Sequence, residues 1–128
     1  EHRQAMVQPF RAAIQSEGEY SLMFVDGEIS HTIRKTPKPG DFRSQEEHGA
    51  DIALVEPEAL LVKRASEAVW ALSVRPLYGR ADMIRNPDGD FEIMELELVE
   101  PSMYLRMDPG APMRFARAII KHARPLTP

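Results

Sequence analysis

The chain contains no cysteine among its 128 residues. That absence excludes disulfide bonds, thiolate nucleophiles and thiolate metal ligands, and it fits a reducing compartment. Long hydrophobic runs are also absent: no apolar stretch approaches the roughly 20 residues that a membrane-spanning helix needs, and the N-terminus has no signal-peptide pattern. We therefore expect a cytoplasmic protein without a membrane partner.

The sequence also lacks a cluster of charge of one sign. Its 16 basic and 20 acidic residues are interspersed and give a formal net charge of −4. Nucleic-acid binding needs a basic surface, so no nucleic-acid partner is expected. With 43% hydrophobic residues, the chain can bury one modest core, which predicts a single domain over residues 1–128. Because it begins without an initiator methionine, we expect a piece of a longer polypeptide.

A first β-hairpin is predicted around Asp26-Gly27, a strong two-residue turn signal that is flanked by residues 20–25 and 28–35. Such a turn pairs Phe24 with Ile29 and Leu22 with His31. His31 then lies among apolar neighbours, and we expect a hydrogen-bonded core histidine rather than a catalytic one. A long loop over residues 36–51 follows.

Two helices complete the predicted fold. Pro57 suits the first position of a helix that Pro76 would stop. Its apolar stripe is Leu61, Ala65, Val69 and Leu72. A last helix is predicted over residues 112–123, with Phe115 and Ile119 on one face. The order of elements predicts an α+β domain, with a mainly antiparallel sheet and helices on one face.

A second hairpin carries charged residues on one face. Its strands, 77–84 and 91–102, flank Asn86-Pro87-Asp88-Gly89. Alternation places Arg80, Asp82 and Ile84 on one side of the first strand. Matching the apolar faces pairs Met83 with Met94, Asp82 with Glu95, and Arg80 with Glu97. A three-residue Pro-Asp-Gly loop with a bulge would shift this pairing by one residue, so a two- or four-residue connection is preferred.

Directly opposed carboxylates destabilise a sheet unless a cation lies between them. Mg²⁺ suits the arrangement of Asp82 and Glu95, since it binds one or two carboxylates together with phosphate oxygens. Arg80 could bind a phosphate oxygen alongside. The alternative is a solvated face on which Arg80 merely pairs with Glu97.

Four segments, taken in order, resemble the C-terminal part of the ATP-grasp domain. The resemblance is closest to the branch of glutathione synthetase-like and ribosomal-protein-S6-modifying ligases. The segments are Met6 to Phe10, Gly18 to Lys35, Asp41-Phe42-Arg43 with His48-Gly49-Ala50, and Arg80-Ala81-Asp82 followed by Met94-Glu95-Leu96-Glu97 and Pro101. The last segment is the most specific.

The resemblance implies a role for each matching residue. Met6, Val7 and Gln8 would contact adenine through the backbone. Lys35, Arg43 and Arg80 would bind phosphate or offset charge on the transferred group.

The resemblance also implies a metal site formed by Asp82, Glu95 and Glu97. The ligands would hold two Mg²⁺ ions, with Glu95 bridging them and Mn²⁺ as an alternative ion. Family members commonly have asparagine where this chain has Glu97. With Glu97 at this position, the segment resembles that of a smaller subgroup of ligases, which includes the cyclo-ligase of cycloserine biosynthesis.

The implied activity is that of an ATP-dependent ligase, which activates a carboxylate as an acyl phosphate for attack by an amine or similar nucleophile. Its substrates would be small molecules, and this fragment alone is expected to be inactive. Two other classes stay open: a non-enzymatic cation-binding module and a structural interaction module. The oligomeric state is also open, with a homo-oligomer as one alternative.

Overall fold

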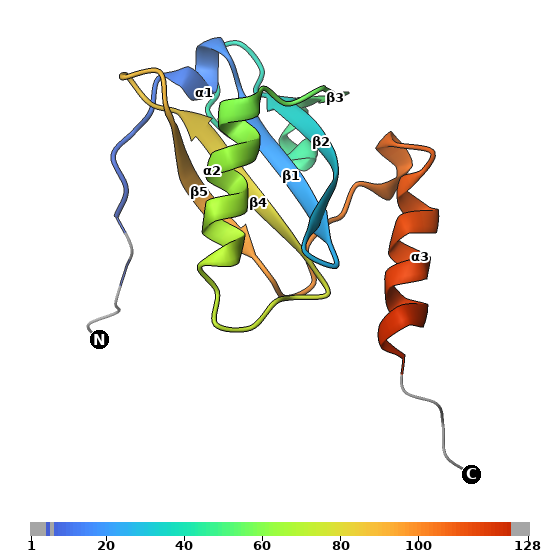
Figure 1. Cartoon of the computed structure of the whole chain (residues 1–128). Helices are drawn as coiled ribbons and strands as arrows, with labels where there is room; N and C mark the ends of the chain where they lie inside the picture. The colour runs from blue at the N-terminus through green and yellow to red at the C-terminus, as the bar shows by residue number, and fades with distance from the viewer. Residues whose placement is uncertain (1–4, 6, 124–128) are drawn as a thin grey trace, which may run out of the picture.

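A computed structural model describes residues 5 and 7–123 of the chain (Figure 1). Five antiparallel strands form one sheet in the spatial order β3-β2-β1-β4-β5. The strands are β1 (Glu19–Val25), β2 (Glu28–Thr36), β3 (Asp51–Leu54), β4 (Tyr78–Arg85) and β5 (Phe91–Glu97). The helices are α1 (Ala13–Ser16), α2 (Ala59–Trp70) and α3 (Ala111–His122), with 3-10 turns η1 (Glu46–His48) and η2 (Leu105–Met107).

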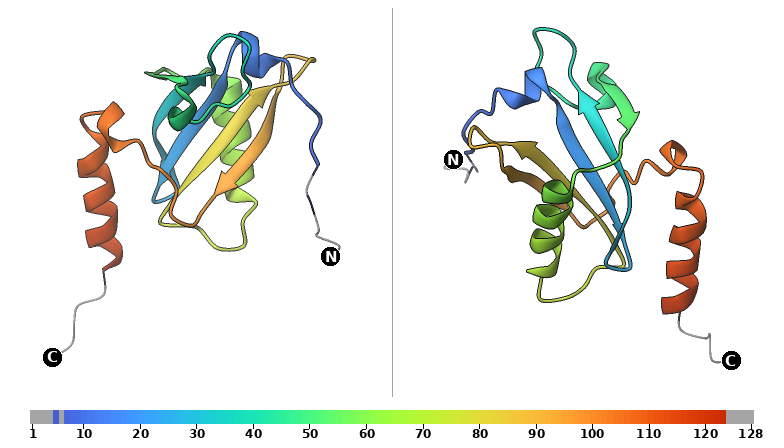
Figure 2. Two further views of the ribbon diagram at one scale, coloured as in Figure 1. Left: turned by 180° about the vertical axis from the view of Figure 1, so that it is seen from behind. Right: turned by 45° about the horizontal axis from the view of Figure 1, so that its top comes forward.

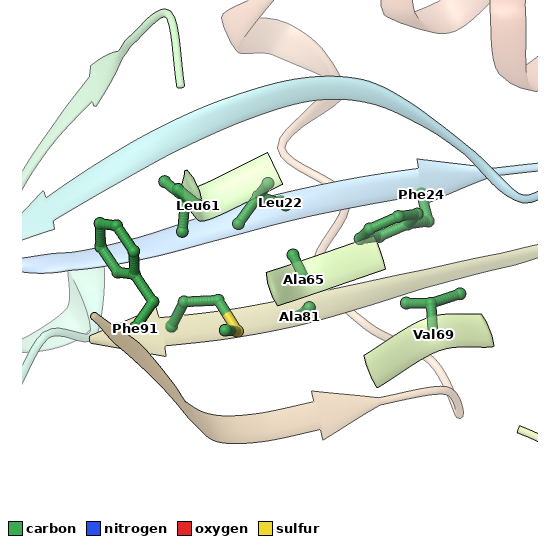
Figure 3. Close-up of a cluster of buried hydrophobic side chains, with 8 residues drawn as sticks. Leu22, Phe24, Leu61, Ala65, Val69, Ala81 and Phe91 are labelled. Carbon is green, nitrogen blue, oxygen red and sulfur yellow. The ribbon is translucent and has the colours of Figure 1, made fainter. Parts of the chain in front are cut away.

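Helix α2 covers one face of the sheet and encloses the larger part of the core (Figure 3). Its buried side chains recur every four residues, as the sequence predicts, and pack on strands β1, β4 and β5. The cluster consists of Leu22, Phe24, Leu61, Ala65, Val69, Ala81, Met83 and Phe91. Burying each of the larger side chains in this cluster, the Leu, Val, Met and Phe residues, stabilises the fold by about 1.5–3 kcal/mol. The helix begins at Ala59 rather than Pro57, because Glu58 is extended at ψ 155°.

Helix α3 packs against the other face, on the hairpin formed by β1 and β2 (Figures 1 and 2). Met23 and Val25 point away from Leu22 and Phe24, since side chains alternate along a strand. They form a second cluster with Met103 and with Ala118 of α3. The α+β class and the antiparallel sheet are confirmed. The expectation that the helices share one face is wrong for α3.

The connection between β4 and β5 differs from the one that we preferred. Asn86 N–H donates to Asp90 O at 2.8 Å, which leaves Pro87 to Gly89 as a three-residue loop, with Gly89 at φ +83°. This loop pairs Met83 with Ile93 instead of Met94. A bulge then shifts the pairing back between Met83 and Asp82, so that Asp82 still pairs with Glu95 and Arg80 with Glu97, as predicted.

A bulge also alters the first hairpin. Phe24 pairs with Ile29 as expected, but His31 pairs with Met23 instead of Leu22. The extra residue moves His31 to the face that carries the second cluster. There it is 6% exposed, with Nε2 3.2 Å from Tyr104 O and Nδ1 3.1 Å from Ser30 Oγ. His31 is therefore the hydrogen-bonded core histidine that the sequence predicts.

Two further elements lie outside the predicted order. Strand β3 begins at Asp51, the last residue of the predicted loop, and pairs with the C-terminal half of β2. The short helix α1 precedes β1. Within the described part of the chain, no helix is long and apolar enough to cross a membrane.

Candidate functional site

The carboxylate of Asp82 lies at the centre of a charged cluster on the sheet face opposite α2. The left view of Figure 2 shows the backbone of the sheet from that side. The residue is 2% exposed. Ser21, its direct partner on β1, donates from Oγ to Asp82 Oδ1 at 2.5 Å. A buried carboxylate needs such donors, because an unpaired buried charge is costly. Asp82 is therefore fixed in position by the sheet itself.

Arg80 contacts all three carboxylates that the sequence assigns to the metal. Its guanidinium binds Asp82 through Nε at 2.9 and 3.1 Å and through Nη2 at 2.9 Å. Nη2 also lies 2.6 Å from Glu97 Oε2 and 3.8 Å from Glu95 Oε2. Burial lowers the pKa of Arg80, but the pairs with Asp82 and Glu97 outweigh it, so the pKa is raised and the side chain stays charged.

Lys35 enters the same cluster from β2. It pairs directly with Glu19 across β1 and β2, and its Nζ lies 2.5 Å from Glu19 Oε1 and 3.5 Å from Asp82 Oδ2. The residue is only 4% exposed. The predicted phosphate-binding lysine thus lies beside the predicted metal ligands, held there by a buried carboxylate.

These side chains line an open pocket of about 380 Å³, which we call the polar pocket. It holds six carboxylates and two basic groups, and so has a formal charge of −4. Its lining residues are Glu19, Lys35, Ser44, Gln45, Glu47, Arg80, Asp82, Glu95, Glu97, Glu100, Ser102 and Tyr104.

A second pocket of about 420 Å³, the apolar pocket, adjoins the first through shared residues Glu19, Ser44 and Gln45. Its other lining residues include Phe10, Ile14, Phe42, Ile84 and Met94. The β5 bulge places Met94 here, whereas the sequence predicted Met94 on the opposite face from Glu95. Gln8 also lines the pocket and donates to Met94 O at 3.3 Å.

Two other residues, Met6 and Val7, were predicted to contact adenine. Val7 is 89% exposed and does not line the apolar pocket, and Met6 lies outside the described residues. Of the two predicted contacts that the structure describes, Gln8 lines the apolar pocket and Val7 does not.

Arg43 is not brought together with the other predicted catalytic residue, Arg80. It lines the apolar pocket, and its half-exposed side chain binds Asp41 through Nε at 3.0 Å and Nη2 at 2.7 Å. This pair holds the pKa of Asp41 well below its usual range. The neighbouring residues Ser44 and Gln45 reach the polar pocket instead.

Sequence reasoning missed Glu19, Ser21 and Ser44 as site residues. Ser44 donates to Glu19 Oε2 at 3.1 Å, and Glu19 in turn binds Lys35. One signal was available, since Glu19 and Ser21 are polar residues at alternate positions of an otherwise apolar strand. Such positions place two polar side chains on one buried face.

The donor set fits a hard divalent cation, although the acids are not arranged as a preformed metal site. Asp82 pairs with Glu95, and Glu97 follows two residues later, so oxygen ligands of the type that Mg²⁺ binds lie on one face. Among the residues that the structure describes, no three acidic or histidine side chains converge as a metal centre. Arg80 and Lys35 neutralise these carboxylates instead.

Comparison with known proteins gives one clear sequence relative. No family model matches the chain. The cycloserine biosynthesis protein DcsG of Streptomyces lavendulae is 32% identical over 130 residues, which cover 94% of this chain and 42% of that protein. The crystal structure of D-cycloserine synthetase DcsG superposes with a TM-score of 0.75 at 26% identity, over 89% of this chain and 41% of the other. The chain thus spans less than half the length of this relative.

Two more distant structures share the fold. ATP-grasp ligase PsnB, complexed with a phosphomimetic variant of its minimal precursor, Mg and ADP, has a TM-score of 0.55 at 17% identity, over 80% of this chain and 32% of that one. D-alanine–D-alanine ligase from Bacillus anthracis, complexed with ATP, has a TM-score of 0.53 at 21% identity, over 80% and 36%. The sheet and its helices are therefore of the ATP-grasp type. The chain is thus similar in sequence to DcsG and shares its fold with ATP-grasp ligases.

Proposed function

We propose that this chain is the C-terminal part of the ATP-grasp domain of an ATP-dependent ligase, which activates a small-molecule carboxylate for attack by an amine or similar nucleophile. The observation that carries the proposal is the apolar pocket adjoining the acidic polar pocket. A nucleotide has a flat, largely apolar base at one end and a polyphosphate at the other. The two pockets match these two parts in order.

Charge supports the same proposal. A polar pocket of formal charge −4 repels a free polyphosphate, which is itself strongly negative at neutral pH. Divalent cations reverse that repulsion, because they bind carboxylates and phosphate oxygens at once. Asp82, Glu95 and Glu97 would hold Mg²⁺, and two ions would neutralise the pocket. When bound, the metal would neutralise charge on the β- and γ-phosphates and orient them.

The reaction would proceed in two balanced steps. An oxygen of the substrate carboxylate attacks the γ-phosphorus, the bond to the β–γ bridging oxygen breaks, and ADP leaves. The nucleophile then attacks the carbonyl carbon of the acyl phosphate, loses a proton, and inorganic phosphate leaves. Neither step needs a nucleophilic side chain, so the protein contributes positioning and charge stabilisation.

The role of each residue in positioning the substrates and stabilising charge would follow from the pocket that it lines. Arg80 and Lys35 line the polar pocket and would offset charge on the transferred phosphoryl group. Arg43, at the apolar pocket, would have to leave Asp41 to do the same. Gln8 would contact the base.

The proposal is tested by the thermal stability of the chain with Mg²⁺, with ATP and with both. A ligand at one hundred times its Kd stabilises the folded state by about 2.7 kcal/mol, which raises the melting temperature by several degrees. We expect a larger rise with both ligands than with Mg²⁺ alone, and we expect Glu95→Gln to abolish the additional rise. Glu67→Gln, which removes a charge from the exposed face of α2, is the matched control.

Each other outcome points to a different class. A rise with Mg²⁺ that ATP does not increase would favour a cation-binding module. A chain whose stability responds to neither ligand nor their combination would contradict the proposal and favour a structural module.

A further inference from the structure

The three carboxylates of the proposed metal site converge on one guanidinium. Arg80 Nη2 lies 2.9 Å from Asp82 Oδ2, 2.6 Å from Glu97 Oε2 and 3.8 Å from Glu95 Oε2. The same side chain donates from Nη1 to Ser102 O at 3.3 Å. The side chain of Arg80 is 9% exposed, so little water screens these contacts. The guanidinium of Arg80 therefore occupies the position that a metal cation would have among these carboxylates, and it supplies the positive charge that they need.

Asp82 has no free capacity for another ligand while Arg80 is bound. A carboxylate offers about four acceptor positions. Asp82 accepts three contacts from Arg80, one from Ser21 and one from Lys35. A metal ion can reach Asp82 only when a donor leaves.

Arg80 is the donor whose departure the geometry favours. Lys35 is anchored by Glu19 at 2.5 Å and lies farther from Asp82, at 3.5 Å, while Ser21 is neutral and does not repel a cation. Arg80 instead contacts all three acids, so a divalent ion bound to them would lie against its positive charge. Because Arg80 lines the polar pocket, its guanidinium has open volume to enter.

We propose that Arg80 is an exchangeable counter-ion: it neutralises Asp82, Glu95 and Glu97 before metal binds, and it leaves them when a divalent cation takes its place. The released guanidinium then faces the polar pocket, where it can bind an anionic phosphate in forked geometry. This inference rests on the proposed function. It adds that metal loading and release of the phosphate-binding arginine are one event.

The exchange predicts that removing Arg80 strengthens metal binding in the absence of nucleotide. Mn²⁺ serves as the probe, and its affinity for the chain is measured by electron paramagnetic resonance of the free ion. We expect Arg80→Gln to bind Mn²⁺ about tenfold or more tightly than the unchanged chain, since one charge-assisted contact is worth that factor. Arg85→Gln is the control: it removes the same charge from the same strand, where Arg85 binds Glu17 and Glu58 away from the polar pocket.

A second measurement uses the unchanged chain and does not depend on how the variant folds. The Nε–H resonance of Arg80 is followed by nuclear magnetic resonance during a Mg²⁺ titration and is assigned by its loss in Arg80→Lys. We expect it to shift with metal occupancy, because Nε loses its bonds to Asp82. The Nε–H resonance of Arg85 is expected to stay in place.

The outcomes separate this inference from the proposed function. If the chain binds Mn²⁺ but Arg80→Gln binds it no more tightly, or if the Arg80 resonance does not move at saturating metal, the exchange is wrong while the metal site stands. If neither the unchanged chain nor Arg80→Gln binds Mn²⁺, and Mg²⁺ with ATP does not stabilise the chain, both proposals fail.

Discussion

Asp82 and Glu95 pair directly across β4 and β5, yet Asp82 is 2% exposed while the side chain of Glu95 is 60% exposed. The two proposed metal ligands therefore contribute differently to the stability of the fold. Asp82 neutralises two buried bases, Arg80 and Lys35. Glu95 lies at the open side of the polar pocket, where loss of its charge has little effect on the fold.

Asp82→Asn is expected to destabilise the domain by about 3 kcal/mol, since it removes the shared partner of two buried cations. The loss stays at the low end of the range for broken buried pairs because Arg80 keeps Glu97 and Lys35 keeps Glu19. Urea unfolding measures the change. Asp88→Asn, in the exposed turn before β5, is the control, and equal stability of the two variants would contradict this role for Asp82.

Glu95→Gln is expected to change the free energy of unfolding by no more than about 0.5 kcal/mol, as for other exposed substitutions. In a complete ligase of the proposed type it is expected to cut turnover severely, because one oxygen ligand of the proposed metal site is lost. ATP consumption measured beside urea unfolding separates the two effects. Unchanged consumption in a folded variant would remove Glu95 from the metal site.

Gly18→Ala is expected to destabilise the fold by about 1–3 kcal/mol. Gly18 has φ +99°, and a Cβ there would lie 2.6 Å from the backbone oxygen of Lys35. Gly40→Ala is the matched control, since Gly40 has φ +84° but no atom within 4 Å of the added Cβ. Thermal unfolding of both variants separates the clash from the backbone strain that they share. A larger loss at Gly40 would contradict a tight contact beside Lys35.

The stability of the domain is expected to fall as the pH drops below about 6.5, because burial lowers the pKa of His31 from that ordinary value. The unfolded chain then binds a proton more readily than the folded one, so the stabilisation is complete above pH 6.5 and is lost as the pH falls through the folded-state pKa. Urea unfolding between about pH 7.5 and 5.5 measures the slope.

His31→Gln is expected to flatten this slope. A slope that persists in His31→Gln would assign the pH dependence to another group.

The pairing of Asp82 with Glu95 and of Arg80 with Glu97 was predicted correctly, but the turn and the bulge that produce it were not. The sequence favoured an unbroken ladder from the turn to Arg80. The structure has a Pro87 to Gly89 loop that shifts the pairing and a bulge beside Met83 that shifts it back. No sequence signal marks that bulge. It allows Phe91 and Leu96 both to pack in the core that α2 covers.

The sequence alone determined the elements whose pattern is local. The 3.6-residue period gave α2 its buried face, Asp26-Gly27 gave the first turn, and the Arg80-Ala81-Asp82 and Glu95-Leu96-Glu97 segments gave the charged face of β4 and β5. Strand alternation is a property of consecutive residues, so it can be read without knowing what the strands pack against.

Only the tertiary structure decided which charges meet. It brought Glu19 and Ser21 of β1 and Lys35 of β2 to Asp82, placed Arg43 apart from Arg80, and set α3 on the face opposite α2. Those placements depend on the strand order β3-β2-β1-β4-β5 and on two bulges. Both follow from how distant apolar side chains fill one core, which no local pattern specifies.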